Sequence, residues 1–158
     1  MMAYKNQHRL KKKKLEEFSK SLREYLGDSP FDTDDQVDIA DSSDGKVLLM
    51  KKKPVAAFFD EDVFPTIEGL LKTDADRSFI TVDMGAVRFV YNGADIMAPG
   101  IVDADENIKE GDLVWIRDVE HKKPLAVGRA MTDGSTMIES NKGKVVKSLH
   151  HVGDGKYR

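Results

Sequence analysis

The stretch VDMGAVRFVYNGADIMAPGI, residues 82–101, is the most informative part of the sequence. A Gly-Ala pair at 85–86 opens a short helical pattern, a second pair at 93–94 ends it, and Pro99-Gly100 follows. Small residues at both ends of a helix let a backbone or a base approach closely, and the helix start offers N–H groups to a phosphate. A second interpretation stays open, in which the glycines only form tight turns around a packed helix.

The flanking sequence predicts a small barrel of short strands. We expect these strands at 79–82, 113–119, 125–131 and 144–152. Gly128 predicts a bulge or a close backbone approach within its strand, and Asp83 can cap a helix over 86–91. Many short strands with glycine turns and one early helix are typical of a mostly closed β-barrel.

The N-terminal half predicts a separate module of one long helix and several strands. An apolar stripe at helical spacing comprises Leu15, Phe18, Leu22, Tyr25 and Leu26. Gly27 should end this helix, and short apolar runs at 37–39, 47–50 and 55–59 predict strands. A short helix is expected from about Asp62 or Val63 to Leu71.

The polar segment 72–78 places a boundary between the two halves. We therefore expect an α+β protein with an N-terminal α+β module, residues 1–76, and a C-terminal barrel-like domain, residues 77–158.

Charge is unevenly distributed along the 158 residues, whose net charge is −3. Residues 1–24 contain eight Lys or Arg and three Glu, whereas residues 28–44 contain seven Asp and no basic residue. The local field decides where an anion binds, so a nucleic-acid partner is compatible with the acidic average. The chain has no cysteine, no apolar run long enough for a membrane span and no apolar stretch behind its basic start. We expect a cytoplasmic protein that has no membrane partner and no secretory signal.

Several motifs together resemble a PUA domain, the RNA-binding pseudobarrel found in pseudouridine synthases and archaeosine transglycosylases. They are the glycine-rich stretch above, Lys109–Ile116 (KEGDLVWI), Leu125–Ala130 (LAVGRA) and the tail from Asn141 to Gly155. The first half is similar to a pre-PUA module at Gly45–Met50, Ala57–Phe59 and Phe64–Lys72. The whole is similar to the malignant-T-cell-amplified-sequence family and its stand-alone archaeal relatives, and also to the N-terminal part of ligatin.

This resemblance implies RNA binding without catalysis, in association with translation and the ribosome. Its eukaryotic members act on the small ribosomal subunit with a partner that carries an SUI1 domain. Carried onto this chain, the RNA-binding groove comprises Gly85, Ala86, Arg88, Gly93, Ala94, Pro99, Gly100, Lys142, Lys144, Lys147, His150 and His151. The alternative for the lysines is a solvated strand face.

A possible second basic patch consists of Arg9, Lys11, Lys12, Lys13 and Lys14. It either grips RNA phosphates or only solubilises a helix surface, and both interpretations stay open. His150 and His151 should point to opposite faces of a strand, so we expect no metal site, and no motif indicates a cofactor. No nucleophile elbow or phosphate loop is present, and nothing in the sequence recommends an enzyme.

Three functions follow from these patterns. The first is a translation-associated factor that binds tRNA or small-subunit rRNA. The second is an RNA-modification accessory that delivers tRNA or guide RNA to a pseudouridine synthase or transglycosylase. The third is a protein adaptor that uses the acidic 28–44 segment and no longer binds RNA.

Overall fold

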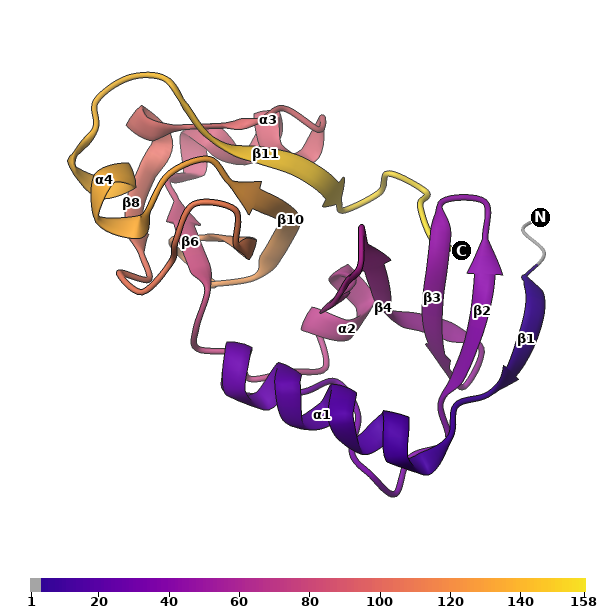
Figure 1. The fold of residues 1–158 in the computed structure, drawn as a ribbon. Helices are drawn as coiled ribbons and strands as arrows, with labels where there is room; N and C mark the ends of the chain where they lie inside the picture. The colour runs from indigo at the N-terminus through magenta and orange to yellow at the C-terminus, as the bar shows by residue number, and fades with distance from the viewer. Residues whose placement is uncertain (1–3) are drawn as a thin grey trace. The chain divides into compact units, whose positions relative to one another are not determined.

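The computed structural model describes residues 4–158, which form two compact units. One unit runs to Asp76 and includes Gly155–Arg158, and the other comprises Arg77–Asp154. Each unit has its own sheet (Figure 1). The division expected from the sequence ended the second domain at residue 158, whereas the last four residues lie with the first unit.

The first unit is a five-stranded antiparallel sheet with one long helix and one short helix. Its elements are β1 (Lys5–Arg9), α1 (Lys12–Leu26), β2 (Asp38–Ser42), β3 (Gly45–Met50), β4 (Lys53–Phe59), β5 (Asp62–Pro65) and α2 (Ile67–Leu70). The strands lie in the order β1-β2-β3-β4-β5, so each pairs with its neighbour in sequence.

Helix α1 confirms the predicted amphipathic helix and its end. Its buried face carries Leu15, Leu22 and Leu26, which recur at helical spacing. Gly27 ends the helix in the left-handed conformation, at φ 88°, and its N–H donates to the carbonyl of Arg23. A residue with a Cβ adopts this conformation only at a cost, which is why glycine stands here.

The predicted start of the short helix is wrong. Asp62–Pro65 form the edge strand β5, which pairs with β4, and α2 begins only after Thr66. The Thr66 hydroxyl accepts the N–H of Gly69 at 3.2 Å and thus caps the helix. Strand β1 was not expected either. In both cases the strand depends on a partner strand, which local sequence patterns do not contain.

The last four residues complete the first unit. The Tyr157 ring packs edge to face on Phe59, with ring centroids 5.7 Å apart. Its N–H donates to an Asp44 carboxylate oxygen at 3.1 Å, and its carbonyl accepts the Tyr4 hydroxyl at 2.6 Å. Tyr157 is only 5% exposed, so the C-terminus is part of this unit's packing.

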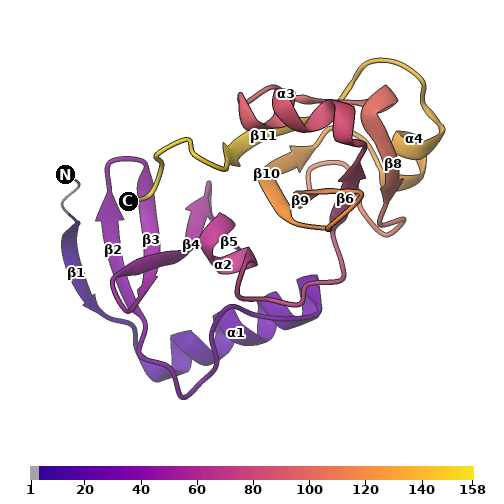
Figure 2. The same ribbon diagram turned by 180° about the vertical axis from the view of Figure 1, so that it is seen from behind.

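The second unit is a nearly closed, barrel-like sheet with two short helices. Its regular elements are β6 (Phe79–Val82), α3 (Val87–Tyr91), β7 (Ile96–Met97), β8 (Ile101–Ala104), β9 (Leu113–Asp118), β10 (Pro124–Ala130), α4 (Gly134–Glu139) and β11 (Lys144–His151). The strand order is β7-β11-β10-β9-β6-β8, and only the β6–β9 pair is parallel among the described strands. Figure 2 shows β9 and β6 from behind. The expected strands and the early helix are confirmed, whereas α4 was not predicted.

Gly128 confirms the predicted bulge. The pairing of β10 with β11 shifts between Val127 and Gly128. A Cβ on Gly128 would lie 2.6 Å from the carbonyl oxygen of Lys147, closer than side chains approach. The core behind these strands includes the fully buried side chains of Ile80, Ile116 and Leu125.

Candidate nucleic-acid interface

A groove of about 710 Å³ lies on the second unit, between the start of α3, strand β7 and strand β11. We call it the α3 groove. Six of the residues expected from the sequence line it, namely Gly85, Ala86, Ala94, Pro99, Gly100 and Lys144. They come from four separate segments of the unit, which the fold brings to one place.

The start of α3 is built as one wall of this groove. Residues 84–86 form a 3₁₀ turn, and the Asp83 carboxylate accepts the N–H of Ala86 at 2.9 Å. The N–H of Asp83 donates to the carbonyl of Gly100 at 2.9 Å, which holds the 98–100 turn against the helix start. A Cβ on Gly100 would lie 3.2 Å from the Cβ of Ala86. The 98–100 turn and the start of α3 therefore approach closely because both carry small residues.

The other end of the α3 groove is polar. Asp95 accepts the N–H of Ser148 at 2.9 Å and pairs with the Lys144 ammonium at 3.5 Å. Gly93 ends α3 at φ 83°, and a Cβ there would lie 3.0 Å from Nε2 of His151. One cation thus stands on the groove wall, and it is already partnered by a carboxylate.

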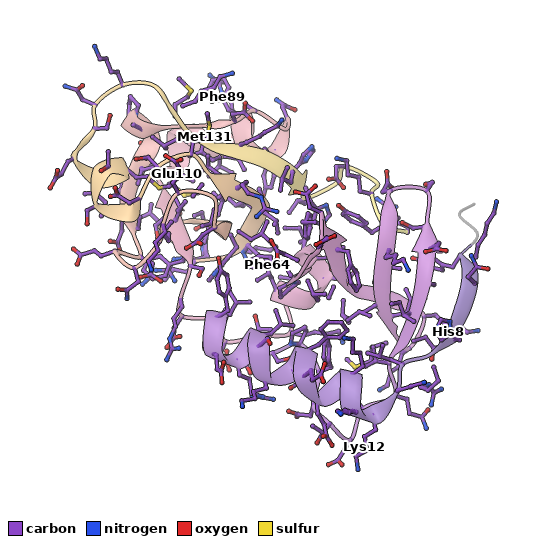
Figure 3. The ribbon with its side chains drawn as sticks, in the orientation of Figure 1. His8, Lys12, Phe64, Phe89, Glu110 and Met131 are labelled. Carbon is purple, nitrogen blue, oxygen red and sulfur yellow. The ribbon has the colours of Figure 1, made fainter. Side chains whose placement is uncertain are left out.

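Apolar and aromatic groups supply most of the remaining lining. Phe89 and Met97 are exposed by 54% and 46%, which is unusual for large apolar side chains. The Arg88 guanidinium lies over the Phe89 ring, 4.9 Å from its centroid, but does not line the groove. Figure 3 labels Phe89 on this unit. An apolar slot with one cation at its edge is suited to a flat base with an adjacent phosphate.

Six of the expected residues lie outside the α3 groove lining, namely Arg88 and Gly93, described above, and Lys142, Lys147, His150 and His151. Lys142 and Lys147 are exposed, and Lys147 stands opposite Arg129 in the β10–β11 register. His150 is only 6% exposed, and its Nδ1 lies 2.8 Å from a carboxylate oxygen of Asp154. His151 is partly buried beside Gly93. His150 therefore has a structural position, which the sequence could not distinguish from that of its neighbour.

The expected basic patch surrounds a second groove, of about 600 Å³, on the first unit. We call it the α1 groove. Arg9, Lys11, Lys13 and Lys14 line it, whereas Lys12 is exposed but points elsewhere. Arg9 donates to Asp38 at 2.7 Å, and its hydrogen bond holds the pKa of that carboxyl below the usual range, with help from Gln7.

Sequence reasoning missed eight further lining residues of the α1 groove, four of which are cationic, aromatic or imidazole side chains suited to binding RNA. These four are His8, Lys46, Phe18 and Phe58. Phe18 was assigned to the helix stripe alone, because helical spacing does not show that the side chain is only half-buried. Figure 3 places His8 on β1 and Lys12 at the start of α1.

Residues 4–158 lack two features that would indicate other functions. No group of three or more His, Asp or Glu side chains lies close enough to hold a metal ion. No helix in the same range has the length and apolar character needed to cross a membrane.

Family models match both units. The PUA domain model matches residues 79–152, and a model described as a domain of unknown function (DUF1947) matches residues 6–73.

Three relatives are similar to this chain over most of its length. An uncharacterized protein of Methanocaldococcus jannaschii is 47% identical over 90% of this chain and 85% of its own length. Translation machinery-associated protein 20 of Eremothecium gossypii is 31% identical over 94% of this chain and 84% of its own length. The crystal structure of a hypothetical protein from Pyrococcus horikoshii matches with a TM-score of 0.83 and 36% identity, over 94% of this chain and 96% of that one.

Proposed function

This chain belongs to the family of PUA-domain proteins that includes translation machinery-associated protein 20, and on this premise we propose that it is a non-catalytic, translation-associated RNA-binding factor. Its PUA domain binds tRNA or small-subunit rRNA through the α3 groove. Its place of action is the cytoplasm, where translation takes place.

The α3 groove is the observation that carries this proposal. Its lining combines small residues at the start of α3, the exposed Phe89 ring and Met97 thioether, and Lys144. Small residues admit a base to the wall, and the apolar surface holds its flat face. The lysine supplies one contact to a phosphate, which positions the RNA but carries no sequence information.

The first unit gives the protein a second surface. We propose that it contacts either the small ribosomal subunit or a protein with an SUI1 domain, as the resemblance to the malignant-T-cell-amplified-sequence family implies. The relative named translation machinery-associated protein 20 supports an association with ribosomes. The particular RNA and the protein partner are what the first experiment identifies.

A pull-down of tagged full-length protein at 0.05 M and 0.2 M salt, with sequencing of bound RNA and mass spectrometry of bound proteins, tests the proposal. We expect small-subunit rRNA or tRNA at low salt and less of either at high salt, because phosphate contacts release counterions. The Ala94→Phe variant, which fills the α3 groove, is the control and should recover less RNA.

Other outcomes of this pull-down contradict the proposal. Recovery of a pseudouridine synthase or transglycosylase with its substrate RNA would indicate an RNA-modification accessory. Recovery of a protein without RNA would indicate an adaptor. Equal RNA recovery by the Ala94→Phe variant and the wild-type protein would mean that RNA does not bind in the α3 groove.

A further inference from the structure

The α1 groove combines aromatic rings with lysines. Phe18 of α1 and Phe58 of β4 are half-buried and pack edge to face, with ring centroids 5.9 Å apart. Both side chains line the groove. An accessible aromatic surface of this kind is where an unpaired base stacks, whatever its sequence.

The cations around these rings are mostly uncompensated. Within residues 4–158, Lys11, Lys13 and Lys46 have no ion-pair partner, although all three line the groove. Arg9 is held by Asp38, and Lys14 lies 3.5 Å from Glu17 and 5.6 Å from the centroid of the Phe18 ring. The groove also contains the carboxylates of Glu17 and Glu61, so positive charge exceeds negative charge along it.

Lys11 and Lys13 lie at the start of α1, where their positive charge is unfavourable for the helix. The start of α1 is the positive end of its dipole, yet its first turn holds no acidic residue and Lys11 gives no side-chain cap. Sequence optimised for helix stability alone would place Asp, Glu, Ser or Thr here. A bound anion would compensate both the lysines and the helix end, so the charge arrangement fits a ligand better than a solubilising surface.

We propose that the α1 groove binds an unpaired nucleotide of single-stranded RNA. The base stacks on the Phe18 and Phe58 rings, and the flanking phosphates lie against Lys11, Lys13 and Lys46. This site is separate from the α3 groove, and it rests on the proposed function in that it names the class of ligand for the first unit's surface. An acidic peptide would use the lysines but leave the aromatic surface without a partner, whereas a nucleotide uses both.

Fluorescence titration of the full-length protein with a short, unstructured RNA that contains 2-aminopurine tests this site. Stacking changes the fluorescence of 2-aminopurine, so the signal reports the base and not only the phosphates. The titrations are made with the Ala94→Phe protein, whose α3 groove is filled. They are repeated with proteins that keep Ala94. The Lys11→Glu, Lys13→Glu double variant should weaken binding at least tenfold in the Ala94→Phe background.

Phe18→Leu keeps an apolar side chain in the helix stripe but removes the stacking ring. We expect it to abolish most of the 2-aminopurine signal while thermal unfolding stays close to that of the parent protein. Lys20→Glu is the matched control, because Lys20 is an exposed lysine of the same helix that does not line the groove. It should weaken binding by less than twofold.

Three results would overturn the inference. In the first, Phe18→Leu changes neither signal nor affinity. In the second, Lys20→Glu weakens binding as much as the Lys11→Glu, Lys13→Glu double variant does, which would indicate a general electrostatic attraction to the helix and not a site in the groove. In the third, polyglutamate displaces the RNA equally well from the parent protein and from Phe18→Leu, which would indicate an acidic protein partner. Complete loss of binding in Ala94→Phe alone would reject the α1 site and leave the proposed function intact, whereas unchanged binding in every variant would reject both.

Discussion

The two grooves differ in the kind of interaction they offer. The α3 groove is mainly apolar, and its one lysine is paired with Asp95. The α1 groove carries three lysines without ion-pair partners among the described residues, beside two aromatic rings. If both proposals hold, RNA binding at the α1 groove should depend more steeply on salt than RNA binding at the α3 groove, because the α1 groove offers more free lysines to phosphates.

The units that carry the grooves also differ in how they are completed. The first unit needs Tyr157 from the end of the chain, whereas the second is built from the continuous segment Arg77–Asp154. A substitution in one unit can therefore be followed separately from the other. The only tryptophan, Trp115, is buried in the second unit and donates to the carbonyl of Arg77 at 2.9 Å, so its fluorescence reports that unit alone.

Tyr157→Ala should have the largest effect, because it removes a buried aromatic side chain from the first unit. We expect a loss of about 3 kcal/mol in the free energy of unfolding of that unit. Urea unfolding followed by far-ultraviolet circular dichroism should show an early transition, while Trp115 fluorescence keeps its midpoint. Coincident shifts of both signals would mean that the units unfold together. Arg158→Ala, at an exposed neighbour, is the control.

Ala94→Phe should have the next largest effect and acts on the α3 groove. Ala94 is exposed, so the larger ring fits without disturbing the core. We expect RNA affinity to fall roughly tenfold, the order of magnitude of one lost stacking contact, with no change in the salt slope. Filter binding at several salt concentrations measures both quantities. If the RNA affinity of this variant depended less steeply on salt than that of the wild-type protein, the α3 groove would bind RNA mainly through phosphate contacts and not through the fit of a base.

Acid should weaken the second unit through Asp118. Burial raises the pKa of this carboxyl, but backbone N–H groups of His121, Lys123 and Glu120 lower it more, and its net shift is downward. Its stabilising contribution is therefore complete above the unfolded pKa of about 3.9 and is lost as the pH falls through the lower folded value. Asp118→Asn should lower the free energy of unfolding of the second unit by about 1 kcal/mol at pH 7. Well below pH 3 it should not change that free energy. Urea unfolding followed by Trp115 fluorescence measures both values. If Asp118→Asn lowered the free energy of unfolding equally at both pH values, the Asp118 charge would not be the source of the stabilisation.

Lys144→Glu should have the smallest of these effects. It replaces the groove lysine with a carboxylate beside Asp95, so the local charge changes sign. We expect RNA affinity to fall about threefold, as for one exposed ion pair. Lys147→Glu is the matched control, because it lies on the same strand outside the groove. A larger loss in the control than in Lys144→Glu would move the RNA path to the β10–β11 face.

Local signals in the sequence were sufficient for much of this fold. The apolar stripe ending at Gly27, the cap at Asp83 and the bulge at Gly128 each depend on residue type and near neighbours, and each is confirmed. Strands β1 and β5 were missed because a strand forms only with a partner distant in sequence. Helix α4 could have been predicted from a local signal, because Asp133 caps it by accepting the N–H of Thr136.

The candidate site was harder to predict than the fold. The positions of small residues such as Gly85 and Gly100 beside the start of α3 could be predicted, because the motif that contains them can be recognised in the sequence. The burial of His150 and the half-exposure of Phe18 and Phe58 could not be predicted, because alternation and helical spacing do not say how far a neighbouring element covers a side chain. Phe18 and Phe58 meet only through the pairing of a helix with a strand 40 residues away.

Photocrosslinking tests most directly the claim that the α3 groove binds RNA. The full-length protein would be irradiated with bound 4-thiouridine-labelled tRNA or small-subunit rRNA, and the crosslinked peptides mapped by mass spectrometry. We predict crosslinks within residues 85–100 and at Lys144, and their loss in Ala94→Phe. Crosslinks that avoid residues 85–100 in the wild-type protein would contradict the account.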